Sequence, residues 1–175
     1  MPPRPYANAE PVIQKIADWA AAKPLLRIYA QKGGWEKYAQ VELAMYLQDK
    51  LGGDPTREVP VFKDDKELAD ILYKPLNEPK YFIELKCQSS LQDSRNVDSF
   101  ANRILDDMIK CDYGGRAPGY ENTPALAIGI GVDPAGVDQA IKIFSKPTFA
   151  YASKTYWTRA QDNINNPMVF FTVFA

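Results

Sequence analysis

The sequence lacks histidine altogether and has two cysteines among its 175 residues. The absence of histidine excludes Ser-His-Asp and Cys-His nucleophile systems, zinc sites that use histidine ligands, and histidine as a general base. Cys87 lies in an apolar stretch and Cys111 on an apolar helical stripe. We therefore expect two reduced thiols in the core of an intracellular protein, not a metal-ligand pair.

Charge of one sign and long apolar runs are also missing. The net charge is −1 and the isoelectric point is about 5.5, so no global basic field attracts polyanions, and nucleic-acid binding would need a local basic patch. No apolar run reaches the length of a membrane span, and residues 1–5 carry no apolar signal-peptide core. We expect one cytoplasmic or nuclear domain, residues 1–175, with no membrane partner.

The most informative stretch covers residues 81–87, which are apolar and aromatic and predict a buried strand. Side chains alternate between the faces of a strand, so Glu84 and Lys86 share one face with Phe82. Burying a carboxylate and an ammonium is costly unless each has a partner or a metal. The pair is therefore a candidate site, and Gln88 extends the same polar row.

Apolar periodicity predicts the remaining elements. Residues 1–11 are proline-rich and expected to be extended. The predicted helices cover 12–22, 35–51, 97–113 and 134–144, and the predicted strands cover 58–62, 69–73, 125–132, 149–157 and 168–174. On helix 97–113, Asp106, Asp107 and Lys110 are expected on the solvent face, with Asp106 and Lys110 as an i,i+4 pair.

Two further acidic residues fall on predicted elements. Glu42 lies among apolar side chains of helix 35–51, and Asp70 lies near the start of strand 69–73. Simple alternatives are a solvated glutamate for Glu42 and an N-cap or turn residue for Asp70. A structural ion pair is the alternative for Glu84 and Lys86.

The order helix, three strands, helix, strand, with Glu42, Asp70, Glu84 and Lys86 in these places, resembles the restriction-endonuclease-like PD-(D/E)XK nuclease superfamily over roughly residues 35–132. The resemblance implies an α/β fold with a central mixed sheet flanked by helices and an αβββαβ core. It implies that Asp70 and Glu84 hold Mg²⁺ or Mn²⁺, that Lys86 helps to activate water, and that Glu42 completes the metal site. These side chains should then share one cleft.

The pattern departs from the family at one position. Ala69 stands where the family has a proline before the aspartate. Asp64 or Asp65 would replace Asp70 as the ligand if the strand began earlier.

The chemistry agrees with the resemblance, because a hard divalent cation on carboxylate oxygens and a neighbouring lysine can hydrolyse a phosphodiester without histidine. The sequence therefore predicts a metal-dependent nuclease acting on DNA or RNA. The acidic isoelectric point favours an alternative, a non-catalytic member of the fold that serves as a protein-interaction or regulatory module with a protein partner. Other chemistry on a small substrate also stays open, and the sequence does not specify the oligomeric state.

Overall fold

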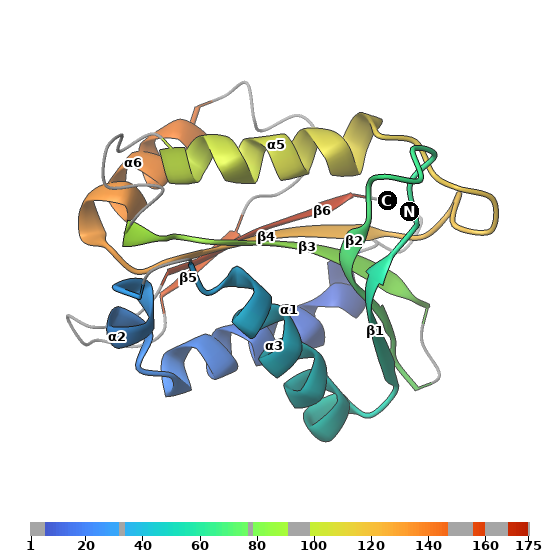
Figure 1. Cartoon of the computed structure of the whole chain (residues 1–175), viewed down its shortest axis with the longest axis horizontal. Helices are drawn as coiled ribbons and strands as arrows, with labels where there is room; N and C mark the ends of the chain where they lie inside the picture. The colour runs from blue at the N-terminus through green and yellow to red at the C-terminus, as the bar shows by residue number, and fades with distance from the viewer. Residues whose placement is uncertain are drawn as a thin grey trace.

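The computed structural model describes residues 6–31, 34–76, 79–90, 99–146, 156–159 and 168–174. A six-stranded mixed sheet lies between two helical layers, and its strand order is β1-β2-β3-β4-β6-β5 (Figure 1). The strands are β1 (Asp54–Val59), β2 (Ala69–Lys74), β3 (Tyr81–Cys87), β4 (Ala125–Gly131), β5 (Tyr156–Arg159) and β6 (Met168–Phe174). The predicted α/β class, with a mixed sheet flanked by helices, is confirmed.

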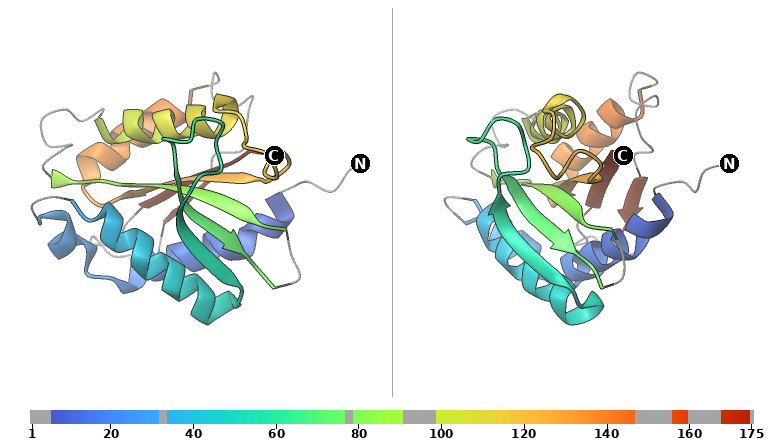
Figure 2. Two further views of the ribbon diagram at one scale, coloured as in Figure 1. Left: turned by 45° about the vertical axis from the view of Figure 1, so that its right-hand side comes forward. Right: turned by 90° about the vertical axis from the view of Figure 1, so that its right-hand side faces the viewer.

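Helices cover both faces of the sheet. Figure 2 shows the two helical layers on opposite sides of the twisted sheet. One layer contains α1 (Tyr6–Ala22), α2 (Leu25–Tyr29) and α3 (Glu36–Leu51), and the other contains α5 (Ser99–Tyr113) and α6 (Pro134–Phe144). No helix in the described part of the chain is long and apolar enough to cross a membrane.

The sheet topology changes at β3. Strands β1, β2 and β3 form an antiparallel meander, whereas β4 returns after α5 and pairs with β3 in parallel, with Glu84 opposite Ala127. A parallel neighbour requires a crossover, and α5 provides it. The prediction that residues 81–87 form a strand in the middle of the sheet is confirmed, since β3 has a neighbour on each side.

Alternation along β3 divides the core in two. Ile83 and Leu85 belong to the cluster packed against α1 and α3, and Phe82 belongs to the cluster packed against α5 and α6. Glu84 and Lys86 alternate with Ile83 and Leu85 along the strand, so they lie on the opposite face, toward α5. The face assignment made from sequence is therefore correct.

Two glycines let helices α5 and α6 approach the sheet closely. A Cβ on Gly129 would lie 2.2 Å from Ile104 Cδ1 of α5, and a Cβ on Gly131 would lie 2.6 Å from Val137 Cγ2 of α6. Both distances are below van der Waals contact, so larger residues would push the helices outward. The close approach of α5 brings its polar side chains within reach of β3.

Two boundaries differ from expectation. Helix α1 begins at Tyr6, so the extended conformation expected for residues 1–11 is wrong for the described residues 6–11, while residues 1–5 lie outside the described part. Strand β1 spans Asp54–Val59 instead of 58–62, because pairing with β2 sets its register. Pro55 is tolerated there since β1 is an edge strand.

The other elements lie close to their predicted positions. Helix α6 has the predicted bounds, α3 begins one residue later than expected, and β2 and β6 occupy the expected stretches. Of the strand expected over 149–157, only residues 156–157 fall in described structure, within β5, and the rest lie outside the described residues.

Candidate functional site

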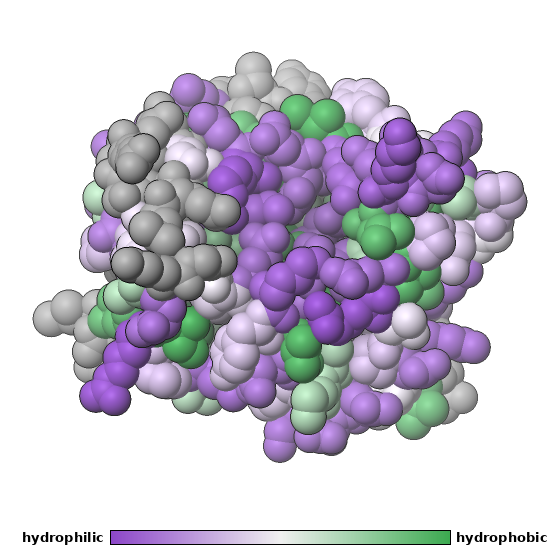
Figure 3. Space-filling model, viewed as in Figure 1, coloured by the Kyte–Doolittle hydropathy of each residue, from purple (hydrophilic) through white to green (hydrophobic). Residues whose placement is uncertain are grey.

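The site is built on β3 where this strand passes between α3 and α5. Glu84 is 3 % exposed and Lys86 lies closer to the surface, with 19 % of its side chain exposed. Figure 3 shows hydrophilic residues gathered across the middle of this face, between the α5 layer and the α3 layer. Side chains from β2, α3 and α5 meet the two β3 charges here.

Asp70 stands at the end of the β2–β3 ladder. Paired residues run from Tyr73 and Tyr81 to Ile71 and Ile83, which places Asp70 next in line with Glu84. Beyond the last pair, Asp70 Oδ2 accepts a hydrogen bond from the Leu85 backbone N–H at 2.7 Å. The carboxylate thus replaces a backbone acceptor and is fixed beside Glu84.

Asp70 is also fixed from the α3 side. Its Oδ1 accepts a hydrogen bond from Gln40 Nε2 at 2.6 Å, and Arg57 donates to Gln40 Oε1 at 3.3 Å. Burial raises the pKa of Asp70 above its usual value, and the Leu85 N–H and the nearby lysines only partly oppose this.

Glu84 presents one bound and one open oxygen. Its Oε2 accepts from Lys110 Nζ of α5 at 3.1 Å, while Oε1 is buried and has no hydrogen-bond partner in the described structure. Burial, reinforced by the negative charge of Asp70, raises the pKa of Glu84 to about 8. Two neighbouring carboxylates, one buried and one half-buried, favour the uptake of a proton or a cation.

Lys86 is held from both layers. Its Nζ lies 3.3 Å from Glu36 Oε1 of α3 and 3.4 Å from Asp107 Oδ2 of α5. Burial acts to lower the pKa of Lys86, but Asp107, Glu36 and Asp70 together raise it above its ordinary value. Lys86 is therefore a fixed cation.

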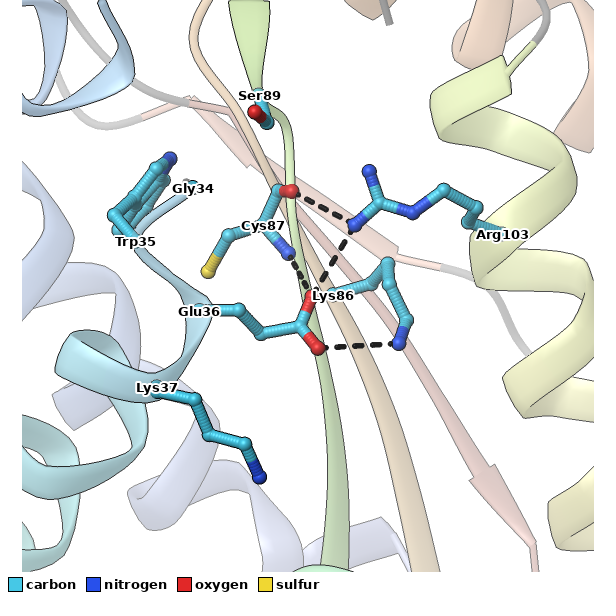
Figure 4. A pocket seen from close by; sticks show the side chains of 8 residues that line it. All are labelled: Gly34, Trp35, Glu36, Lys37, Lys86, Cys87, Ser89 and Arg103. Carbon is cyan, nitrogen blue, oxygen red and sulfur yellow. Dashed lines mark hydrogen bonds and ion pairs between the residues drawn. The ribbon is translucent and has the colours of Figure 1, made fainter. Parts of the chain in front are cut away.

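Glu36 joins the layers at the first turn of α3. Its Oε2 accepts from the Cys87 backbone N–H and from Arg103 Nη2, each at 3.2 Å, and Arg103 also donates to the Cys87 carbonyl at 3.0 Å. Figure 4 shows the Glu36 carboxylate between Lys86 and the Arg103 guanidinium of α5. A pocket of about 280 Å³ opens here, lined by Gly34, Trp35, Glu36, Lys37, Lys86, Cys87, Ser89 and Arg103.

The interactions of Asp107 and Lys110 correct the sequence interpretation of α5. Both were expected on the solvent face, but Asp107 is 9 % exposed and Lys110 bonds to Glu84 and to the Leu68 carbonyl. Burial is the main cause that raises the pKa of Asp107 to about 6. The helical spacing indicates that Asp107 is buried, because Asp107 follows Ile104 by three residues and precedes Cys111 by four. It therefore lies within the apolar stripe of α5.

The structure brings Asp70, Glu84 and Lys86 together, but it places Glu42 elsewhere. Glu42 pairs with Lys23, which follows α1. Gln40 and Glu36, which are four residues apart on α3, contact the site instead. Glu42 is two residues beyond Gln40, a rotation of about 200° around the helix, so it points away from the site. The i,i+4 spacing of Glu36 and Gln40, which continues to buried Leu43 and Leu47, is the sequence pattern that indicates the side of α3 facing the sheet.

The alternative aspartates also lie apart from the site. Asp64 accepts from the Lys66 N–H in an exposed turn before β2, and Asp65 is exposed in the same turn. Gln88 is buried, but its Oε1 accepts from the backbone N–H groups of Val132 and Asp133. Gln88 therefore ties β3 to the end of β4.

The seven residues Glu36, Asp70, Glu84, Lys86, Arg103, Asp107 and Lys110 are called the charge network below. Its Asp70 and Glu84 offer the hard oxygen ligands that Mg²⁺ or Mn²⁺ prefers, and Glu84 Oε1 is an open donor atom. No group of three acidic or cysteine side chains in the described ranges is arranged to hold a metal ion. The protein would thus contribute two carboxylates.

No protein-family model, curated protein or solved structure matches this chain.

Proposed function

We propose that this protein is a divalent-metal-dependent nuclease, a phosphodiester hydrolase acting on DNA or RNA, with a restriction-endonuclease-like core. The observation that carries the proposal is the pair of half-buried Asp70 and buried Glu84 at the end of the β2–β3 ladder, with Glu84 Oε1 open. The order α3, β1, β2, β3, α5, β4, with β4 parallel to β3, supports it as the αβββαβ order that the sequence resemblance implies.

In this proposal Asp70 and Glu84 hold the cation. A bound Mg²⁺ or Mn²⁺ supplies positive charge that acidifies a water and neutralises phosphate oxygens. Gln40 and the Leu85 N–H fix the orientation of Asp70, and Lys110 fixes one oxygen of Glu84. Because the two carboxylates are already oriented, little reorganisation energy is needed when the charge of the reacting group changes.

Lys86 acts as a charged hydrogen-bond donor in this proposal. Its two carboxylate partners, Glu36 and Asp107, keep the ammonium charged and hold it beside the Asp70 and Glu84 pair. An ammonium in this position lowers the cost of forming hydroxide and stabilises a phosphate oxygen as negative charge develops. Because the Lys86 ammonium is already protonated, the proton released by the attacking water would pass to bulk solvent water.

The test is a cleavage assay on plasmid, single-stranded DNA and RNA, with Mg²⁺, Mn²⁺ or EDTA. We expect metal-dependent cleavage by the wild type and loss by orders of magnitude in Glu84→Gln, which keeps the shape of the side chain but removes its charge. Glu42→Gln is the matched control, because Glu42 contacts Lys23 away from the site, and should retain cleavage. Folded wild type that cleaves none of the three substrates with either metal would refute the proposal.

A second candidate is a non-catalytic protein-interaction or regulatory module of the same fold. The observation that favours it is that both β3 charges already have protein partners, Lys110 for Glu84 and Glu36 and Asp107 for Lys86. A purely structural network predicts a large fall in melting temperature for Glu84→Gln and for Lys86→Met, without metal binding by the wild type. Near-native melting of both variants argues against this module.

A further inference from the structure

The carboxylate of Glu36 is held by three hydrogen-bond donors. Lys86 Nζ donates to Glu36 Oε1 at 3.3 Å, and Arg103 Nη2 and the Cys87 backbone N–H each donate to Glu36 Oε2 at 3.2 Å. Figure 4 shows Lys86, Arg103 and the Cys87 backbone converging on this carboxylate. The three donors are called the anion cradle below. Cationic side chains and backbone N–H groups are the donors with which proteins bind phosphate oxygens, so the cradle suits an oxyanion from outside the chain.

The anion cradle adjoins the pocket, whose volume of about 280 Å³ is several times the roughly 30 Å³ share of one water molecule and leaves room for a phosphate group. The side chain of Glu36 is 28 % exposed at the first turn of α3, so a change of rotamer takes its carboxylate into solvent. The other charged side chains that line the pocket are the cations Lys37, Lys86 and Arg103. With Glu36 turned outward, the pocket is a local basic patch on a chain of net charge −1.

Exchanging the Glu36 carboxylate for a phosphodiester conserves the charge of the site. Each group carries one negative charge, so the ammonium of Lys86 and the guanidinium of Arg103 stay compensated. Asp107 holds Lys86 from the α5 side at 3.4 Å and does not move in this exchange. The first turn of α3 also lines the pocket, and the positive end of the helix dipole favours a negative group there.

We propose that the anion cradle binds a backbone phosphate of the nucleic-acid substrate, and that the Glu36 carboxylate holds this place until the substrate displaces it. The inference deepens the proposed function, on which the choice of a nucleic acid rests. The phosphate that Lys86 contacts then also accepts hydrogen bonds from Arg103 and from the Cys87 N–H. Arg103 is thus a substrate-binding residue, and Glu36 is an internal competitor of the substrate.

The experiment measures the binding of three probes by isothermal calorimetry in EDTA. The probes are a thymidine dinucleotide with one phosphodiester, its uncharged methylphosphonate analogue, and inorganic phosphate. We expect Glu36→Ala, which empties the cradle, to bind the dinucleotide about tenfold or more tighter than the wild type, and the analogue no tighter. Glu36→Gln keeps the shape of the side chain without its charge and should show a smaller gain. Adding Arg103→Met to Glu36→Ala should remove the gain.

Glu58→Ala is the matched control. Glu58 pairs with Lys37, which lines the same pocket, and it is outside the anion cradle. Both alanine variants raise the net charge by one, so a general effect of charge would strengthen binding equally in the two. Thermal melting is followed in phosphate and in chloride at equal ionic strength, because removing Glu36 also removes a partner of Lys86. Phosphate should raise the melting temperature of Glu36→Ala more than that of the wild type.

The outcomes separate the anion cradle from the proposed function. Equal dinucleotide affinity in the wild type and the Glu36 variants, an equal gain in Glu58→Ala or for the methylphosphonate, or no extra stabilisation of Glu36→Ala by phosphate overturns the cradle. A gain for inorganic phosphate alone overturns its role in binding the substrate. Tighter dinucleotide binding without cleavage by the wild type keeps the cradle as a phosphate site and refutes the nuclease. Cleavage without tighter binding refutes the cradle alone.

Discussion

Asp107 Oδ2 of α5 lies 3.4 Å from Lys86 Nζ of β3, and 12 % of the Asp107 side chain is exposed. The pair links a helix to the central strand on the same face as the Lys110–Glu84 pair. The two β3 charges, spaced two residues apart, therefore meet two α5 charges spaced three apart. This match requires both the pleat of the strand and the turn of the helix.

Replacing Asp107 should destabilise the protein more than replacing its neighbour. Asp107→Asn removes one of the two carboxylates that hold Lys86, and we expect the free energy of unfolding to fall by about 1–3 kcal/mol. Asp106→Asn is the control on the same helical turn, since Asp106 is exposed, and should change stability by less than about 0.5 kcal/mol. Urea denaturation measures both, and equal losses would contradict the structural role of Asp107.

Stability should fall as pH rises when metal is absent. The pKa of Glu84 is raised from 4.5 to about 8, so between these values the folded protein binds a proton that the unfolded chain has lost. The resulting stabilisation is fully present below pH 4.5 and is lost as pH rises through 8, with a slope of at most about 1.4 kcal/mol per pH unit. Asp107 adds the same trend between 3.8 and about 6.

The measurement is a set of chemical denaturation curves from pH 5 to 8.5 in EDTA. Glu84→Gln cannot ionise, so its curve should be flatter above pH 6 than that of the wild type. A wild-type curve as flat above pH 6 as that of Glu84→Gln would show that Glu84 is already ionised over this interval in the folded protein.

Lys86→Met should separate catalysis from metal binding. The variant keeps the aliphatic stem but loses the ammonium, so we expect cleavage to fall by about 100-fold or more while the Mn²⁺ dissociation constant changes by less than about tenfold. Lys37→Met is the control, because Lys37 lines the same pocket but is largely exposed and pairs with Glu58. Equal effects of the two variants on cleavage would assign Lys86 no specific role.

Gly129→Ala should weaken the contact between α5 and the sheet. The new Cβ would meet Ile104 Cδ1 at 2.2 Å, and overpacking of this kind costs about 1–3 kcal/mol. Combining it with Ile104→Val removes the clashing methyl group and should recover part of the loss, as seen by double-mutant analysis of unfolding. Additive losses would mean that the clash is relieved by another movement.

Several features of this protein follow from the sequence alone. Residues 81–87 form a strand because the stretch is apolar and aromatic, and Glu84 and Lys86 share a face because strand side chains alternate. Helices α3 and α5 follow from apolar periodicity, and the glycine pair after each helix marks its end. These are local patterns, and each can be evaluated within a short window of sequence.

The partners of these charges depended on the tertiary structure. Whether Asp70 or Asp64 lies beside Glu84 depends on the β2–β3 register, and whether Glu36 or Glu42 reaches Lys86 depends on the rotation of α3 about its axis. The local sequence pattern determines neither the β2–β3 register nor the rotation of α3, because either choice of acidic residue fits nearly the same apolar periodicity. Pairing across the sheet and packing of helices at close range fix them, since a charge buried without a partner would destabilise the fold by several kcal/mol.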